Sequence, residues 1–217
     1  MARERADLVI VGAGTIGGWA SVFAREAGVQ DVVVLEREQA GAGASGRAAG
    51  MVRAQGGTPD TVRLGSWSIG FYASQRDRYD TDSGFMQRGY VILATTARGE
   101  RAARDRITMQ RSVGLDARWV DVDEIRRLIP AMAGDGYRGG SYVATDGWVD
   151  PPRNVRAYAL AMQRAAVSLR EGVAFVGIRT RAGRRRRRDR PGGPALQAVA
   201  AATVTPFTGA VRSETIA

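Results

Sequence analysis

Near the start of the chain, the pattern of apolar and polar positions changes from that of a strand to that of a helix and then back. The letters LVIV and VVVL are short, fully apolar runs, and the stretch between them has the mixed character of a helix. Short apolar runs on either side of a helical stretch are typical of two parallel strands joined by a crossover helix. The pattern predicts a βαβ unit from Asp7 to Glu36.

The later chain alternates between helix and strand periods. Apolar residues at helical spacing predict a helix over Thr61–Tyr79, with Trp67 and Phe71 as core residues. Strand patterns occupy Phe85–Thr95, Arg118–Val120, Tyr137–Thr145 and Gly172–Ile178. Helices are predicted over Ala97–Val113, after a cap at Asp121, and over Pro151–Arg170, with a turn at Asp146 and Gly147. This order predicts an α/β fold in which a Rossmann-like nucleotide domain is interrupted by a mixed, antiparallel-rich substrate domain.

Three glycines follow the first apolar run at GxGxxG spacing. Gly12 allows a tight turn, Gly14 lets backbone approach a pyrophosphate, and Gly17 lets the helix pack closely on the sheet. The pyrophosphate would lie at the positive N-terminus of the helix. Glu36 would accept a hydrogen bond from a ribose hydroxyl, and its charge disfavours a 2′-phosphate such as that of NADP. Such glycines alone also fit an ordinary strand-to-helix loop, but strand, helix, strand and acid in register favour dinucleotide binding.

The segment Gly41–Gly57 is rich in glycine and alanine. It is expected to wrap a cofactor, because several glycines permit close approach of backbone to a ligand. Its polar side chains are Ser45, Arg47, Arg53 and Gln55. Composition alone leaves a flexible connection as the alternative.

Composition excludes several kinds of catalysis. The chain has no cysteine and no histidine, and all 32 of its basic residues are arginine. Disulfides, thiolate nucleophiles, Schiff-base lysines, serine-histidine triads and metals held by cysteine or histidine are therefore excluded. Catalysis must come from a cofactor or from carboxylates, tyrosines and arginines, and no metal site is expected. The arginine-only basic set, with much alanine and glycine, suggests a GC-rich bacterial genome.

The net charge is concentrated in one segment. Arg179–Arg190 holds eight arginines and one aspartate, so it carries +7 of the formal +10 and leaves +3 for the other residues. This arginine run allows a second hypothesis, nonspecific and salt-dependent binding to nucleic acid. The lack of any aromatic residue between Ile178 and Pro206 removes a stacking platform for bases and disfavours that hypothesis.

A run of 17 uncharged residues, Leu8 to Ala24, superficially resembles a secretion signal or a membrane anchor. The glycine fingerprint explains its composition, and no small-residue cleavage site follows it. The run is also shorter than the ~20 residues that a bilayer span needs. We therefore expect a cytoplasmic protein without a membrane span.

Three segments carry a further signal: DLVIVGAGTIGGWAS with VVVLERE, GAGASGRAAGMVRAQ, and ATDGWVDPPRNVRAYALAMQRAA. In that order, they resemble the N-terminal FAD fingerprint, the flavin-proximal loop and the segment that re-enters the FAD domain in the FAD-dependent amine oxidoreductases. This is the family of D-amino-acid oxidase, glycine oxidase, the sarcosine oxidase β subunit and dimethylglycine dehydrogenase. The similarity covers about residues 6 to 178. It implies FAD-dependent oxidation of the C–N bond of a small amine or amino acid, such as sarcosine, glycine or a D-amino acid, by hydride transfer to flavin.

The resemblance also implies site residues. Those expected to bind FAD are Gly12, Gly14, Gly17, Glu36, Arg37, Ser45, Gly46, Arg47, Gly50 and Met51. Arg53 matches the position that holds the substrate carboxylate, with a surface arginine as the alternative; no other catalytic residue is assigned. Tyr90 is a candidate for the substrate wall, with sheet packing as its alternative. Relatives that link flavin covalently use histidine or cysteine, so FAD is expected to be non-covalent here.

The resemblance suggests a domain division. Residues 1–80 hold the FAD-binding βαβ unit, loop and helix, 81–145 a partial substrate domain, 146–178 the return to the FAD domain, and 179–217 a basic low-complexity tail. Family members extend further, and RTRAGRRRRRDR replaces the strand expected after Ile178. We therefore expect a truncated or frame-shifted relative that is oligomeric or lacks a C-terminal portion. An inactive FAD-binding fragment and an NAD-dependent dehydrogenase remain alternatives.

Overall fold

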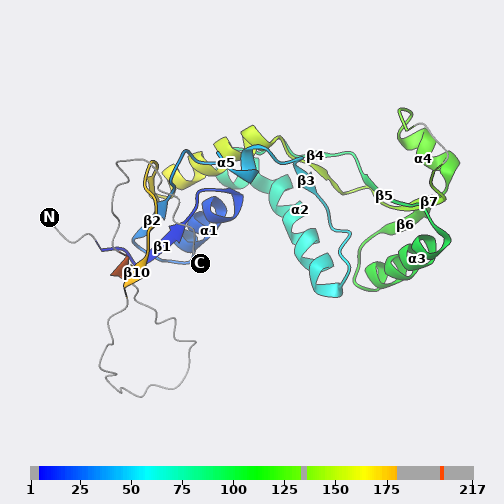
Figure 1. The fold of residues 1–217 in the computed structure, drawn as a ribbon, viewed down its shortest axis with the longest axis horizontal. Coiled ribbons are helices and arrows are strands. Elements are labelled where there is room, and N and C mark those ends of the chain that lie inside the picture. The colour runs from blue at the N-terminus through cyan, green and yellow to red at the C-terminus, as the bar shows by residue number, and fades with distance from the viewer. Residues whose placement is uncertain (1–4, 133–135, 180–200, 203–217) are drawn as a thin grey trace, which may run out of the picture. The chain divides into compact units, whose positions relative to one another are not determined.

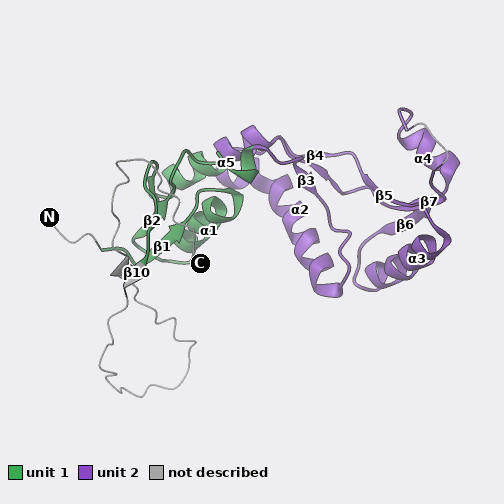
Figure 2. Ribbon diagram, viewed as in Figure 1, with its two compact units in different colours: residues 1–46, 158–217 green, residues 47–157 purple. Residues whose placement is uncertain are grey.

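The computed structural model describes residues 5–132, 136–179 and 201–202 (Figure 1). The chain divides into two compact units, a first unit of residues 1–46 and 158–217 and a second unit of residues 47–157 (Figure 2). Most of the predicted basic tail, including residues 180–190 of its arginine run, lies outside the described residues. Within that tail the structure describes only Arg179, in strand β10 (Ile178–Arg179), and its antiparallel partner β11 (Ala201–Ala202).

The first unit is built on a three-stranded parallel sheet. Its strands are β1 (Leu8–Val11), β2 (Val32–Leu35) and β9 (Ser168–Arg170), in the order β1-β2-β9. Helix α1 (Thr15–Glu26) connects β1 to β2 and buries Trp19 and Val22. The predicted βαβ unit is confirmed, and the uncharged run Leu8 to Ala24 consists of β1, the glycine turn and most of α1.

No helix in the described ranges combines the length and apolar character that crossing a bilayer requires.

The return to the first unit differs from the prediction. Helix α5 (Pro151–Arg164) ends six residues before the predicted Arg170, and the strand expected at Gly172–Ile178 lies earlier, at β9. Ala166 takes a left-handed conformation (φ 55°) and ends the helical path. Residues 168–170 then pair with β2, so tertiary strand pairing overrides the helical pattern of the local sequence.

The second unit contains two antiparallel sheets and three further helices. One sheet has the order β3 (Met51–Val52), β8 (Gly147–Trp148), β4 (Met86–Gln87); the other has the order β5 (Tyr90–Ala94), β7 (Gly139–Val143), β6 (Ala117–Val120). The helices are α2 (Pro59–Tyr79), α3 (Ala97–Ser112) and α4 (Val122–Leu128). The antiparallel character agrees with the prediction, but the single strand expected over Phe85–Thr95 is divided at Gly89, which has φ 78°.

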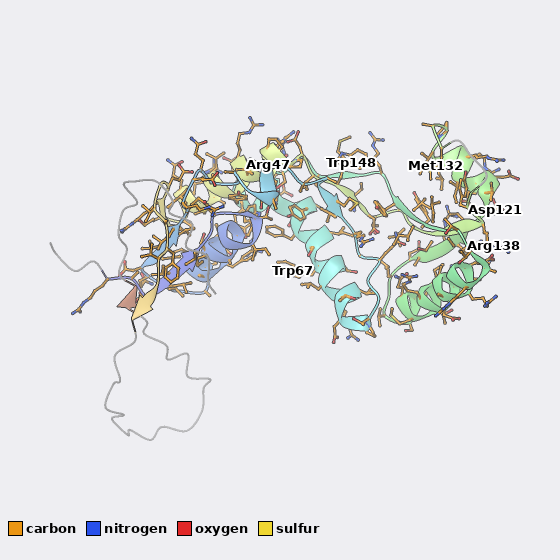
Figure 3. The ribbon with its side chains drawn as sticks, in the orientation of Figure 1. Arg47, Trp67, Asp121, Met132, Arg138 and Trp148 are labelled. Atoms are coloured by element: carbon orange, nitrogen blue, oxygen red, sulfur yellow. The ribbon has the colours of Figure 1, made fainter. Side chains whose placement is uncertain are left out.

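Helix starts in this unit follow the sequence signals. The Glu124 N–H donates to Asp121 Oδ1 at 2.8 Å, which confirms the predicted cap of α4. Asp121 is labelled in Figure 3. Thr58 and Thr96 cap α2 and α3 in the same way, through the N–H groups of Thr61 and Gly99.

Two buried clusters form the core of the second unit. The larger includes Val52, Val62, Ile69, Ile107 and Val143, and the smaller is formed by Val120, Ile125 and Tyr137. Phe71 is buried as predicted, but Trp67 is 54% exposed, so its assignment to the core is wrong. Trp67, labelled in Figure 3, instead stacks on Phe71, one turn along α2, with ring centroids 5.5 Å apart.

The turn predicted at Asp146 and Gly147 lies two residues earlier, at Ala144 and Thr145. Gly147 pairs with Val52 and Gln87 as part of β8, and Asp146 is fully buried. A dipeptide that commonly forms a turn is therefore used here to start a strand.

Candidate nucleotide-binding site

The turn between β1 and α1 has the geometry that its glycines predict. Gly12 has φ 98°, a conformation that side chains strongly disfavour, and its N–H donates to the Leu35 carbonyl at 2.8 Å. A Cβ on Gly17 would overlap the Gly12 carbonyl oxygen and come within 3.2 Å of the Ile10 side chain. The tight turn and the close helix packing both depend on glycine.

The N-terminus of α1 suits an anion. Gly14 is the N-cap residue and has no side chain to cap the helix, and the first turn contains no acid. Ser45, in the 3₁₀ helix η1 (Ala44–Gly46), accepts a hydrogen bond from the Thr15 N–H at 2.9 Å. A Cβ on Gly14 would lie 2.9 Å from Ser45 Oγ, so a side chain there would press on the hydroxyl that caps Thr15; we call the α1 N-terminus with Ser45 the cradle. Unpaired N–H groups at a helix start attract phosphate.

The backbone of Ala13, between the first two glycines, is held on both sides. Its N–H donates to Glu36 Oε2 at 2.9 Å, and its carbonyl accepts from the Gly41 N–H at 3.0 Å and the Tyr158 hydroxyl at 2.9 Å. The other Glu36 oxygen accepts the Glu38 N–H at 3.0 Å. Because a carboxylate has about four acceptor sites, Glu36 retains capacity for a ribose hydroxyl.

Tyr158 and Gly18 are parts of this site that sequence reasoning missed. Tyr158 is fully buried, and a Cβ on Gly18 would lie 2.5 Å from its ring. Burial raises the pKa of Tyr158 to about 12, and the charge of Glu36 adds to the shift. The hydroxyl therefore stays protonated and can donate to Ala13. Gly18, the second glycine of the pair Gly17-Gly18, was the one sequence signal that could have pointed to this close contact.

Two other residues predicted to bind FAD, Gly46 and Arg37, lie in the first unit, one in a tight loop and the other at the surface. The Gly46 N–H donates to the Gly41 carbonyl at 2.9 Å, and a Cβ on Gly46 would lie 2.5 Å from the same oxygen. The hydrogen bond closes residues 41–46 into a tight loop that ends in η1. Arg37 is exposed and pairs with Glu38 at 3.4 Å.

Arg47, Gly50, Met51 and Arg53 lie in the second unit and are described within it. Gly50 is buried with φ 72°, and its carbonyl accepts the Val149 N–H at 2.8 Å. Arg47 is exposed (Figure 3).

Arg53, Tyr90 and Met51 form one cluster. The Arg53 guanidinium carbon lies 5.9 Å from the centre of the Tyr90 ring, and the Tyr90 hydroxyl lies 2.9 Å from Met51 Sδ. Arg53 is exposed. Tyr90 is half-buried at the start of β5, which makes it both a sheet residue and a neighbour of Arg53.

A buried carboxylate lies behind this cluster. Asp146 Oδ1 accepts the Ala54 N–H at 2.8 Å, and its Oδ2 accepts Gln55 Nε2 at 3.0 Å. Burial raises the pKa of Asp146, and the two hydrogen bonds and the charge of Arg53 offset part of the rise. Sequence reasoning missed this residue because the dipeptide Asp146-Gly147 has a strong turn preference.

The sequence matches the FAD dependent oxidoreductase family, DAO, over residues 7–205. It is 29% identical over 184 residues to glycine oxidase of Geobacillus kaustophilus (strain HTA426), which covers 82% of this chain and 48% of that protein. It is 28% identical over 170 residues to 4-methylaminobutanoate oxidase (formaldehyde-forming) of Paenarthrobacter nicotinovorans, covering 76% of this chain and 20% of that protein.

Solved structures share the fold. L-proline dehydrogenase from P. horikoshii superposes with a TM-score of 0.77 at 22% identity, over 83% of this chain and 48% of that one. The G. kaustophilus glycine oxidase structure gives a TM-score of 0.69 at 29% identity, over 80% and 48%. The chain thus spans at most about half the length of these relatives. The family match over most of the sequence, together with the predicted βαβ fold, confirms the resemblance: the chain belongs to the FAD dependent oxidoreductase family.

Proposed function

We propose that this protein is an FAD-dependent oxidoreductase that oxidises the C–N bond of a small amine or amino acid. The main support is the glycine turn held by Glu36 and Tyr158 in a chain of this family. Bound FAD would supply the electron acceptor, taking a hydride from the carbon beside nitrogen, after which water hydrolyses the resulting imine. The protein's part is to bind, orient and shield the reactants.

The α1 N-terminus would hold the pyrophosphate and Glu36 the ribose. The proposed FAD residues are Gly12, Gly14, Gly17, Glu36, Arg37, Ser45 and Gly46 in the first unit, and Arg47, Gly50 and Met51 in the second. The α1 N-terminus suits a phosphate because its N-cap residue, Gly14, has no side chain and its first turn contains no acid. The absence of histidine and cysteine from the sequence supports a non-covalent cofactor.

Arg53 would bind the substrate carboxylate through its planar fork of donors. The names of two relatives support this choice, because glycine and 4-methylaminobutanoate each combine an amine with a carboxylate. The exposed position of Arg53 beside Tyr90 keeps the guanidinium accessible. A cytoplasmic location in a bacterium and the four-part domain division remain part of the proposal.

The visible spectrum of the purified protein tests cofactor binding. Yellow colour that acid releases into solution would demonstrate non-covalent flavin. Anaerobic addition of sarcosine, glycine or D-alanine should then bleach the flavin absorption. Bound flavin that none of these bleaches would favour the inactive-fragment alternative, and retention of NAD in place of flavin would favour the dehydrogenase.

A further inference from the structure

A buried polar cluster lies beneath the Arg53 segment. The Asp146 carboxylate accepts hydrogen bonds from Ala54 and Gln55, and the Asp146 main-chain carbonyl accepts the Gly89 N–H at 2.9 Å. The Gln55 amide also donates to the Tyr90 carbonyl at 2.9 Å and accepts the Ser141 hydroxyl at 2.8 Å. The cluster thus ties the segment after Arg53 to β5, β7 and the start of β8.

Burying the Asp146 carboxylate costs free energy, and an aspartate in a solvent-exposed turn would not incur this cost. A buried charge is tolerated only where hydrogen bonds replace its water. Both partners of the Asp146 carboxylate are donors, a main-chain N–H and a side-chain amide, which suits its ionised form. The carboxylate therefore fixes the Ala54 backbone and the Gln55 side chain together.

Helix α2 confines the same backbone from another side. A Cβ on Gly65 would lie 2.7 Å from both the Ala54 Cα and the Arg53 carbonyl oxygen. The residue after Arg53 is thus held between a glycine of α2 and the Asp146 carboxylate.

We propose that Asp146 is a positioning residue, whose carboxylate clamps the Arg53–Gln55 backbone so that the Arg53 guanidinium is presented in one orientation. The role of Arg53 itself rests on the proposed function. A long side chain is placed only as accurately as the backbone that carries it, and misplacement of about 1 Å can cost 100-fold in rate.

The test compares the parent with Asp146→Asn, which keeps the side-chain size but replaces one acceptor oxygen with a donor. Hydrogen exchange of the peptide containing Arg53–Gly56, followed by mass spectrometry, should become about tenfold faster, as the loss of one hydrogen bond predicts. In the FAD-loaded protein the KM for sarcosine should rise by about tenfold, with kcat and flavin content nearly unchanged. Ser141→Ala, which removes only the donor to Gln55, should give a smaller change of the same kind.

Asp150→Asn is the matched control. Asp150 lies four residues further on and accepts the Arg153 N–H at 2.8 Å at the start of α5, a role that asparagine also fills. Parent-like exchange in Asp146→Asn would overturn the proposal, as would faster exchange with an unchanged KM. If Asp146→Asn fails to fold, parent-like exchange in Ser141→Ala would overturn it. Faster exchange in Asp146→Asn, combined with a parent that oxidises no amine, would support the clamp and refute only the proposed function.

Discussion

Ala13 shows how side chains and backbone from distant parts of the chain can order a loop. Its N–H and carbonyl are held by Glu36, Gly41 and Tyr158, so the turn between β1 and α1 is ordered by the protein itself. A ligand that meets an ordered loop does not have to supply the free energy of ordering it. If the proposed cradle binds phosphate, its affinity depends on this preformed shape, and single substitutions test it.

Gly14→Val should abolish FAD binding. The branched side chain would meet Ser45 Oγ and fill the space where backbone must approach the pyrophosphate. Flavin retained after desalting, measured by absorbance per protein, checks this. Gly57→Val adds the same side chain where a Cβ meets nothing within 4 Å and serves as the control. Equal flavin retention in both variants would contradict the prediction.

Arg53→Met should impair substrate binding and spare the cofactor. Loss of a charge-assisted contact predicts a KM for sarcosine raised by about 10- to 100-fold, with flavin content unchanged. Steady-state kinetics measure this, with Arg63→Met as the control, because Arg63 is exposed and pairs with Asp60 at 3.0 Å on α2. Unaltered kinetics would show that Arg53 is a surface arginine that does not bind the substrate.

Asp146 should make stability fall as pH rises. Its folded-state pKa lies above the ordinary value of 3.8, so the folded protein binds more protons between these two values. The free energy of unfolding of the parent, relative to Asp146→Asn, should therefore decrease from about pH 4 upward and level off above the raised pKa. Urea unfolding of both proteins at several pH values measures the difference. A relative stability that increases with pH would show that the pKa is lowered.

Residues that act on near neighbours in the sequence were predictable, and residues whose partners are far away along the chain were not. Gly12 and Gly17 act within one turn, so their spacing reveals their roles. Asp146 bonds to Ala54, 92 positions away, and Tyr158 bonds to Ala13, 145 positions away. No local pattern encodes such pairs, and only the folded chain identifies them.

At the scale of elements, the start of α4 was predicted correctly, whereas the end of α5 was not. Asp121 caps α4 as expected, because a cap depends on a side chain and an N–H three residues away. The end of α5 depends on β2, which captures residues 168–170 as a strand. The position of Trp67 likewise depends on which sides of α2 other elements cover.

Helix α2 offers a matched pair of glycines. Gly70→Ala should stabilise the protein by about 0.5–1 kcal/mol, because Gly70 is exposed, its Cβ would meet nothing within 4 Å, and alanine favours helix. Gly65→Ala should destabilise it, because the Cβ would lie 2.7 Å from the Ala54 backbone. Denaturant midpoints measure both changes. Equal shifts in the two variants would show that α2 does not press on the Arg53 segment.

At the scale of the molecule, the second unit carries its own core. Both buried clusters lie between Val52 and Val149, within residues 47–157. We expect residues 47–157 expressed alone to unfold cooperatively with a free energy of about 5 kcal/mol, measured by tryptophan fluorescence in urea. Residues 1–46 alone, without Tyr158 and β9, are the control and should stay unfolded. A gradual, non-cooperative signal from residues 47–157 would contradict this independence.

The hydrogen bond between Tyr158 and Ala13 has a consequence for protein synthesis. The glycine turn leaves the ribosome early, but the ring that packs on Gly18 and the strand that pairs with β2 follow only after the whole second unit has been translated. Domains generally fold as units while the chain emerges. The nascent second unit can therefore fold before Tyr158 and β9 complete the turn between β1 and α1, so the proposed cofactor would bind only late in the maturation of this chain.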